Sequence, residues 1–222
     1  MILLPIGKDL FFYLSFLQPI IYVKEHLYSS NNLHRRITMD SIQKLDSNIL
    51  VYIQEHIRNT SLSKFFIPVT HLGDWGLITI LVIILLLMTP KHRRTGYMCI
   101  LGLVLDALII NLLIKPAVGR MRPYDVIKNF KAIVPLFSDK SFPSGHTAAA
   151  FVVAVIIFKT MPVRYGIFAL IIATLIGISR LYVGVHYPTD VLCAAIIGSL
   201  IGILTVKLYR SIDTHLKKKR RK

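Results

Sequence analysis

The sequence predicts an all-α protein, a polytopic membrane bundle with five or six transmembrane helices. Of the 222 residues, 54% are hydrophobic and the mean hydropathy is +0.61, both high for a soluble domain. The hydrophobic residues are concentrated in runs of about 18 or more, the length that a helix needs to cross a bilayer. Clusters of Lys and Arg lie at the ends of these runs, as is usual for membrane proteins.

The N-terminal part is the least regular. Residues 1–23 are apolar, which makes them a candidate for a sixth span. Two prolines and a Lys–Asp pair interrupt them and weaken this candidate. They lack the basic start and the cleavage site of a signal peptide. Residues 39–59 have apolar side chains near helical spacing, with charges between them. We expect an amphipathic helix at the outer interface there, or alternatively an ordinary surface helix.

Five further apolar runs follow, and each is expected to span the membrane as one helix: residues 66–89, 97–114, 145–158, 165–182 and 189–206. The first run stops at Pro90, and a short basic turn separates the third from the fourth. We therefore divide the chain into an N-terminal extension (1–38), a membrane domain (39–206) and a basic tail (207–222). The start could be Met1 or Met39.

The formal net charge of +16 is explained by the membrane and does not require nucleic acid. Three basic segments, at 91–94, at 159–164 and in the tail, fall on the same side of the five predicted spans. The positive-inside rule makes that side cytoplasmic, in a multi-pass cell-membrane protein. Residues 115–144 and the segment near His186 then lie outside. Residues 115–144 are also basic, so their charges need another explanation.

The cysteines indicate neither a disulfide nor a metal site. Cys99 and Cys193 are predicted near opposite faces of the bilayer, and no Cys or His cluster has metal-ligand spacing. No metal and no cofactor is expected.

Three polar clusters converge on the outer face, because each lies at the outer end of a predicted span. They are Lys115 to Arg122-Pro123, then Pro143-Ser144-Gly145-His146, and then Ser179-Arg180 to His186 and Asp190. Taken singly, each cluster passes as a helix cap or a charged flank. Their joint position on one face favours a single site.

This site is suited to a phosphoryl group. Lys115, Arg122 and Arg180 supply three cations, with Asp190 as the only nearby carboxylate, and guanidinium groups match phosphate oxygens. Ser144 and Gly145 open a helix, where free N–H groups attract anions.

Two histidines supply the chemistry. Asp190, four residues after His186, can orient that imidazole and leave its other nitrogen free to attack phosphorus. His146 is a candidate acid for the leaving oxygen. Three cations neutralise the transition state without magnesium.

These motifs resemble the type 2 phosphatidic acid phosphatase family, which shares its site with vanadium haloperoxidases. The signature is Lys, six residues, Arg-Pro; then Pro-Ser-Gly-His; then Ser-Arg, five residues, His, three residues, Asp. Every position of it is present here. The resemblance covers about residues 46–206. Within the family, the chain resembles small bacterial undecaprenyl-diphosphate or phosphatidylglycerophosphate phosphatases.

The resemblance implies a role for each signature residue. It implies His186 as the nucleophile, Asp190 as its partner and His146 as the general acid. The implied phosphate-binding residues are Lys115, Arg122, Ser144, Gly145 and Arg180. It also implies a helical membrane fold, no required metal, and lipid phosphates or diphosphates as substrates, with undecaprenyl diphosphate as the first candidate.

Two charged residues lie outside the signature. Asp106 is midway along the second predicted span, too deep for the outer site, so a structural role with a neighbour such as Asn111 is favoured over catalysis. Arg120 is expected either to attract anionic headgroups or to solvate its loop.

Several alternatives stay open. Phosphatidylglycerophosphate or phosphatidate could be the substrate, and a lipid phosphotransferase would use the same residues. A haloperoxidase-like oxidase is disfavoured by the spans. A non-enzymatic protein that binds anionic lipid through its tail is disfavoured by the intact signature. The sequence specifies neither the lipid nor the oligomeric state.

Overall fold

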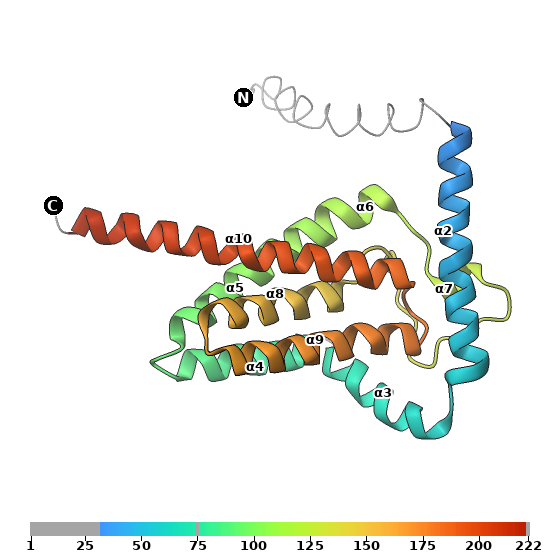
Figure 1. Ribbon diagram of the computed structural model, residues 1–222, viewed down its shortest axis with the longest axis horizontal. Helices are drawn as coiled ribbons and strands as arrows, with labels where there is room; N and C mark the ends of the chain where they lie inside the picture. Colours follow the sequence, from blue (N-terminus) through green and yellow to red (C-terminus); the bar gives the residue numbers. More distant parts are fainter. Residues whose placement is uncertain (1–31, 74–75, 221–222) are drawn as a thin grey trace, which may run out of the picture. The chain divides into compact units, whose positions relative to one another are not determined.

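The computed structural model describes residues 32–73 and 76–220, and these residues form helices and loops without a strand (Figure 1). The chain divides into two compact units, residues 1–45 and 46–222. In the first unit only the start of helix α2 (Asn32–Tyr52) is described. The candidate sixth span, residues 1–23, lies outside the described residues. All the predicted site residues belong to the second unit.

The helix expected over residues 39–59 is present. It comprises α2 and the π-helical segment η1 (Ile53–Ile57). Within the second unit this region is two-sided, because Leu50 is fully buried against Phe130 and Tyr187 while Tyr52 is 57% exposed. Its position at the membrane interface stays a prediction, as does the division of the chain into three regions.

The first predicted span is not one continuous helix. Residues 66–89 fall instead in α3 (Thr60–Gly73) and α4 (Leu77–Met88), which are bent by 56° relative to each other. Gly76, immediately before α4, has φ +65°, a left-handed conformation that glycine adopts without strain. Averaging hydropathy over the whole run conceals this break, although Gly73, Asp74 and Gly76 interrupt the apolar sequence there.

The other four predicted spans are present as helices, with bounds that extend beyond those expected. They are α5 (Arg93–Ala107) with η3 (Leu108–Ile114) and α6 (Lys115–Val118), then α8 (Gly145–Thr160), α9 (Val163–Tyr182) and α10 (Pro188–Arg220). A short helix, α7 (Pro123–Val126), follows α6. Most of the basic tail is helical, since α10 continues through it.

Three helical stretches of the described residues are long and apolar enough to cross a bilayer: Arg93–Val126, Val163–Tyr182 and Pro188–His215. The bent pair α3 and α4 could supply a fourth, and α8 is apolar but shorter, with 16 residues. The membrane helical bundle predicted from the sequence is thereby confirmed. Large apolar side chains such as Phe168 and Leu192 are more than 60% exposed, as expected for groups that face lipid.

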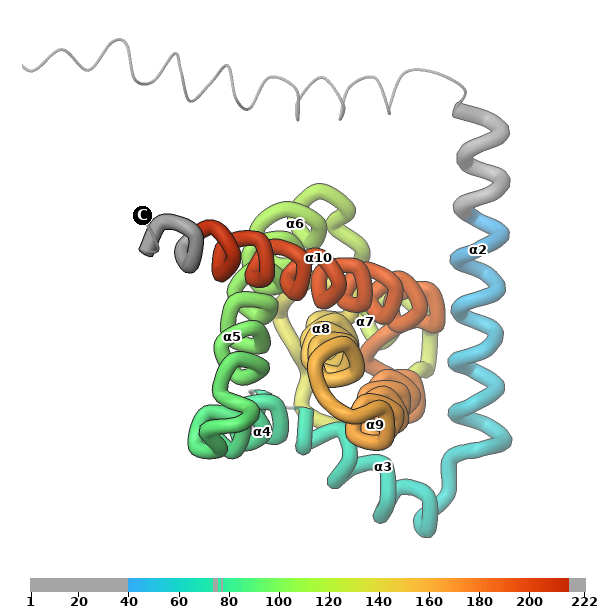
Figure 2. Tube along the Cα trace, turned by 60° about the vertical axis from the view of Figure 1, so that its left-hand side comes forward, coloured from blue at the N-terminus to red at the C-terminus, as the bar shows by residue number. Residues whose placement is uncertain are grey.

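Helix α8 is the centre of the bundle. Figure 2 shows it nearly end-on between α5, α9 and α10, and it packs against all three. Val152 and Ile156 of α8 are fully buried in a core shared with α4, α5 and α10. A helix surrounded by protein need not match the bilayer thickness itself, which explains why α8 can be short.

A glycine on α10 permits the close contact with α8. A Cβ added at Gly198 would lie 2.4 Å from the carbonyl oxygen of Ala148. Because real Cβ atoms do not approach that closely, the two backbones can meet here only at glycine. This contact fixes the start of α8 beside the first turns of α10, where the polar clusters lie.

Candidate active site

The three polar clusters meet at one cavity of about 440 Å³. Five of the eight predicted site residues line it: Lys115, Arg122, Gly145, His146 and His186. The other three, Ser144, Arg180 and Asp190, are fully buried and lie outside the lining. Both imidazoles therefore face the same cavity, although 40 positions separate them in the sequence.

His186 lies in the loop between α9 and α10 and is almost fully buried. Its Nε2 is 3.4 Å from Nη1 of Arg122. Arginine can only donate hydrogen bonds, so Nε2 is the acceptor, and the imidazole is neutral with its proton on Nδ1. Nδ1 faces Oδ2 of Asp190 at 3.6 Å, which is longer than an ordinary hydrogen bond.

Burial lowers the pKa of His186 to about 4, and the positive charges of Arg122 and Arg180 act in the same direction. The carboxylate of Asp190 raises the pKa but does not offset these effects. His186 therefore stays neutral at physiological pH, the state that a nucleophilic imidazole needs.

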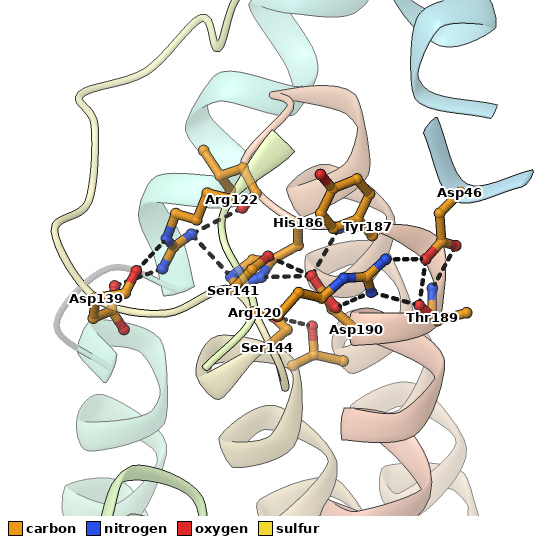
Figure 3. Close-up of polar contacts among 12 residues, drawn as sticks. Asp46, Arg120, Arg122, Asp139, Ser141, Ser144, His186, Tyr187, Thr189 and Asp190 are labelled. Atoms are coloured by element: carbon orange, nitrogen blue, oxygen red, sulfur yellow. Dashed lines mark hydrogen bonds and ion pairs between the residues drawn. The ribbon is translucent and has the colours of Figure 1, made fainter. Parts of the chain in front are cut away.

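Asp190, in the first turn of α10, is saturated with hydrogen bonds (Figure 3). Its Oδ2 accepts the backbone N–H of Tyr187 at 2.9 Å and the hydroxyl of Ser141 at 2.5 Å. Its Oδ1 accepts Nη1 of Arg120 at 2.6 Å. Asp190 is thus held rigidly beside His186.

Arg120 has neither of the roles expected from the sequence. Its side chain is only 16% exposed, and its Nη2 donates to Oδ2 of Asp46 at 2.6 Å. Asp46, on α2, is buried and also accepts the backbone N–H of Thr189 at 3.1 Å. The spacing gave no signal for Asp46, because 74 positions separate it from Arg120.

A second carboxylate corrects the expectation that the cations have only Asp190 near them. Asp139, in the loop before α8, pairs with Nζ of Lys115 and lies 2.6 Å from Nη2 of Arg122. Burial would raise the pKa of Asp139, but the two cations outweigh it and lower the pKa to about 2. Two of the three predicted phosphate-binding cations are therefore paired with a carboxylate. Such pairs, together with those of Arg120, account for part of the basic charge of residues 115–144.

Phe137 was also not predicted. Its ring lies 4.9 Å from the guanidinium carbon of Arg122 and 5.0 Å from that of Arg180. It also makes an edge contact with the ring of His146 at 6.0 Å. A stacked aromatic ring holds guanidinium groups without neutralising their charge.

The opening of α8 leaves room for a ligand at Gly145. A Cβ there would meet only Nζ of Lys115, at 3.9 Å. Ser144 is fully buried, and its Oγ accepts the hydroxyl of Thr147 at 2.9 Å. Arg180 is also fully buried, and its Nη1 donates to Oγ1 of Thr70 at 2.7 Å.

Asp106 is nearer the site than expected. It lines the same cavity as His186, together with Asn111, so the argument that it lies too deep is wrong. The cavity extends along α5 and η3 for nine residues from Lys115, about 13 Å of helix. Oδ1 of Asp106 is buried without a hydrogen-bond partner. The π-helical segment η3 begins two residues later, and such segments often occur at functional sites.

Within residues 32–73 and 76–220, no group of three His, Cys, Asp or Glu side chains is arranged to hold a metal ion. Cys99 and Cys193 are both free.

Comparisons with known proteins agree with this geometry. Residues 96–212 match the PAP2 superfamily. An undecaprenyl-diphosphatase of Sulfolobus acidocaldarius is 28% identical, over 90% of this chain and 87% of its own length. Phosphatidylglycerophosphatase B of Bacillus subtilis is 33% identical, over 75% of this chain and 82% of its own. The crystal structure of a PAP2-type phosphatidylglycerolphosphate phosphatase from Bacillus subtilis superimposes with a TM-score of 0.65 at 28% identity, covering 90% of this chain and 96% of that one.

Proposed function

This chain belongs to the PAP2 superfamily and is a membrane lipid phosphatase, and from that premise we propose that it hydrolyses undecaprenyl diphosphate through a phosphohistidine on His186. The observation that carries the proposal is that a neutral, buried His186 and Arg122 line the same cavity, with Nε2 of His186 3.4 Å from Nη1 of Arg122. The relative from Sulfolobus acidocaldarius favours the diphosphate substrate.

Binding of the terminal phosphate comes first. Lys115 and Arg122 line the cavity and bind the oxygens of the phosphate. The backbone N–H of Gly145, at the positive end of α8, also donates to the phosphate. Arg180, whose guanidinium group lies against the ring of Phe137, adds positive charge near the phosphate. Because Asp139 pairs with the same two cations, the phosphate has to displace this carboxylate as it enters.

Phosphoryl transfer then uses both histidines. Nε2 of His186 attacks phosphorus, the P–N bond forms, and the bond to the bridging oxygen of the lipid monophosphate breaks. His146 donates a proton to that oxygen. Asp190 stabilises the positive charge that develops on His186.

Hydrolysis completes the cycle. His146, now neutral, accepts a proton from water as the water attacks phosphorus. The P–N bond breaks, inorganic phosphate leaves, and His186 returns to its neutral form. The charge of the transferring group is neutralised by the protein's cations in both steps, so the proposal includes no metal.

An apolar groove supports a long-chain substrate. A second cavity of about 220 Å³ lies between α4, α8 and α9 and shares Thr79, Ala150 and Ile176 with the catalytic cavity. It continues along α8 to Met161, about 16 Å of helix and half of the roughly 30 Å hydrocarbon core. We place the start of the lipid chain in this groove.

A glycerophospholipid is the second candidate substrate. Asp106 and Asn111 give the catalytic cavity a polar wall below Lys115, where a prenyl chain has no hydrogen-bonding group. A glycerol hydroxyl could bond there, and the Bacillus subtilis relative is named for such a lipid.

A substrate panel tests the choice. Purified protein would be given undecaprenyl diphosphate, phosphatidylglycerophosphate and phosphatidate, with EDTA present, and phosphate release measured with and without an added alcohol. The proposal predicts the highest kcat/KM for the diphosphate and transfer to water. A preference for phosphatidylglycerophosphate would contradict the substrate, and transfer to the alcohol would indicate a phosphotransferase.

We also assign the site to the extracytoplasmic face, from the basic segments at the opposite ends of the helices. In a variant with both native cysteines replaced, Leu136→Cys (Leu136 is 68% exposed) should react with an impermeant thiol reagent in intact cells. Tyr165 lies in the first turn of α9, at the end away from the catalytic cavity, and Tyr165→Cys should react only after lysis. The reverse pattern would place the site in the cytoplasm.

A further inference from the structure

Arg120 joins two buried carboxylates that belong to distant parts of the chain. Its Nη1 lies 2.6 Å from Asp190 and its Nη2 lies 2.6 Å from Asp46 (Figure 3). The side chains of Asp190 and Asp46 are 0% and 2% exposed. Arg120 does not line the catalytic cavity, unlike Lys115 and Arg122, so it is not placed to bind the substrate phosphate.

The network is anchored to the first turn of α10. Thr189 accepts Nη1 of Arg120 at 2.7 Å, and its own hydroxyl donates to Asp46 at 2.5 Å. The guanidinium of Arg120 also lies 3.9 Å above the ring of Tyr187, the residue after His186. A buried ion pair repays its desolvation only when further hydrogen bonds satisfy it, and each partner here has them.

The charge balance of the network bears on His186. The positive charge of Arg120 partly neutralises the carboxylate of Asp190. Because Arg120 is also paired with Asp46, it neutralises Asp190 less than it would alone. The other titratable and charged groups around His186 are Arg122 and Arg180, with Asp139 paired to Arg122. Lys115, His146 and Asp106 line the same cavity. Arg120 and Asp46 act on His186 from the opposite side, through Asp190.

We infer that Arg120 and Asp46 are positioning residues, which hold Asp190 in place and set how strongly it supports a positive charge on His186. This inference rests on the proposed role of His186. It assigns catalytic function to α2, a helix that lies outside the PAP2 match at residues 96–212.

Two single-charge variants test it, because their effects have opposite signs. In Asp46→Asn, Arg120 binds Asp190 alone, so the protonation midpoint of His186 should fall. In Arg120→Gln, Asp190 is released from its cation, and the midpoint should rise. One charge at about 10 Å, at an effective dielectric constant near 20, shifts a midpoint by about one pH unit.

Kinetics give the second readout. With undecaprenyl diphosphate, kcat should fall about 10- to 100-fold in both variants, and KM should change less than about threefold because the phosphate ligands are untouched. Asp46→Glu and Arg120→Lys, which keep the charges, should each recover part of kcat. Asp40→Asn, an exposed aspartate on the same helix, is the matched control and should behave as the wild type.

The midpoint of His186 would be followed by NMR of histidine-labelled protein in detergent, with His186→Ala used to assign the signal. This titration needs no substrate, so it tests the inference even if the lipid assay fails. Midpoints that are unchanged, or that move in the same direction, would overturn the positioning role. A raised KM with unchanged kcat in Arg120→Gln would make Arg120 a phosphate ligand. Absence of turnover in the wild type, with shifted midpoints in the variants, would instead contradict the proposed function alone.

Discussion

In the proposed mechanism the carboxylate of Asp139 competes with phosphate for Lys115 and Arg122, so removing its charge should tighten phosphate binding. In Asp139→Asn the backbone carbonyl of residue 139 still accepts Nε of Arg122, at 2.9 Å, so the loop keeps one anchor. The change isolates the pairs that the side chain makes with Lys115 and Arg122.

The size of the effect follows from exposure. The Asp139 side chain is 48% exposed, so each pair is worth about 0.2–1 kcal/mol. Arg122 and Lys115 are only 3% and 12% exposed, which puts both pairs near the upper end of that range. Together they contribute about 1–2 kcal/mol, and the variant should bind phosphate about 5- to 30-fold more tightly.

The assay is product inhibition by inorganic phosphate, measured for the wild type and Asp139→Asn. Asp125→Asn, an exposed aspartate outside the cavity, is the control. Because the pKa of Asp139 is lowered to about 2, its carboxylate is ionised at neutral pH, where the two proteins are compared at one fixed pH. Unchanged or weaker inhibition would refute competition and would mean that Asp139 orients the two cations.

Three further predictions concern the cavity and the bundle. On the acidic side of its pH profile, the rate of enzyme phosphorylation should fall only as pH drops through about 4, where His186 becomes protonated; an acidic limb centred near 6.5 would contradict the buried, neutral imidazole. Asp106→Asn should keep kcat within about tenfold, because Asp106 has no place in the proposed steps, and a loss of about 1,000-fold in single-turnover assays would make it catalytic. Gly198→Ala should destabilise the protein by about 1–3 kcal/mol in thermal unfolding, because its Cβ meets the backbone of Ala148; a shift no larger than that of the lipid-facing Leu200→Ala would contradict the close contact.

The sequence could predict the convergence of the clusters because helix ends alternate between membrane faces. Lys115, His146 and His186 each lie at the same end of a predicted span, so the order of the spans alone brings them to one face. No comparable rule covers contacts made by loops. Asp139 reaches Lys115 across 24 positions of irregular chain, and nothing in the spacing indicates that pair.

Changes of helical geometry within the apolar runs were not predicted. The π-helical segment η3 lies in nearly continuous apolar sequence, where hydrophobicity has no phase that could reveal a change in helical geometry. The reach of the cavity to Asp106 could not be foreseen for the same reason. The bend before α4 did have a signal, because Gly73, Asp74 and Gly76 interrupt the apolar run there, and averaging over the whole run concealed it. Arg120 was misjudged because its partner Asp46 comes from the part of the chain where the pattern was weakest.

The most direct test of the account is to trap the covalent intermediate. Wild-type protein would be mixed with undecaprenyl diphosphate labelled in its terminal phosphate, with EDTA present, and quenched in alkali, where phosphohistidine survives. The account predicts label on the peptide that contains His186, within a single turnover, and none in His186→Ala. Phosphate release by His186→Ala at the wild-type rate, or label on another residue, would contradict it.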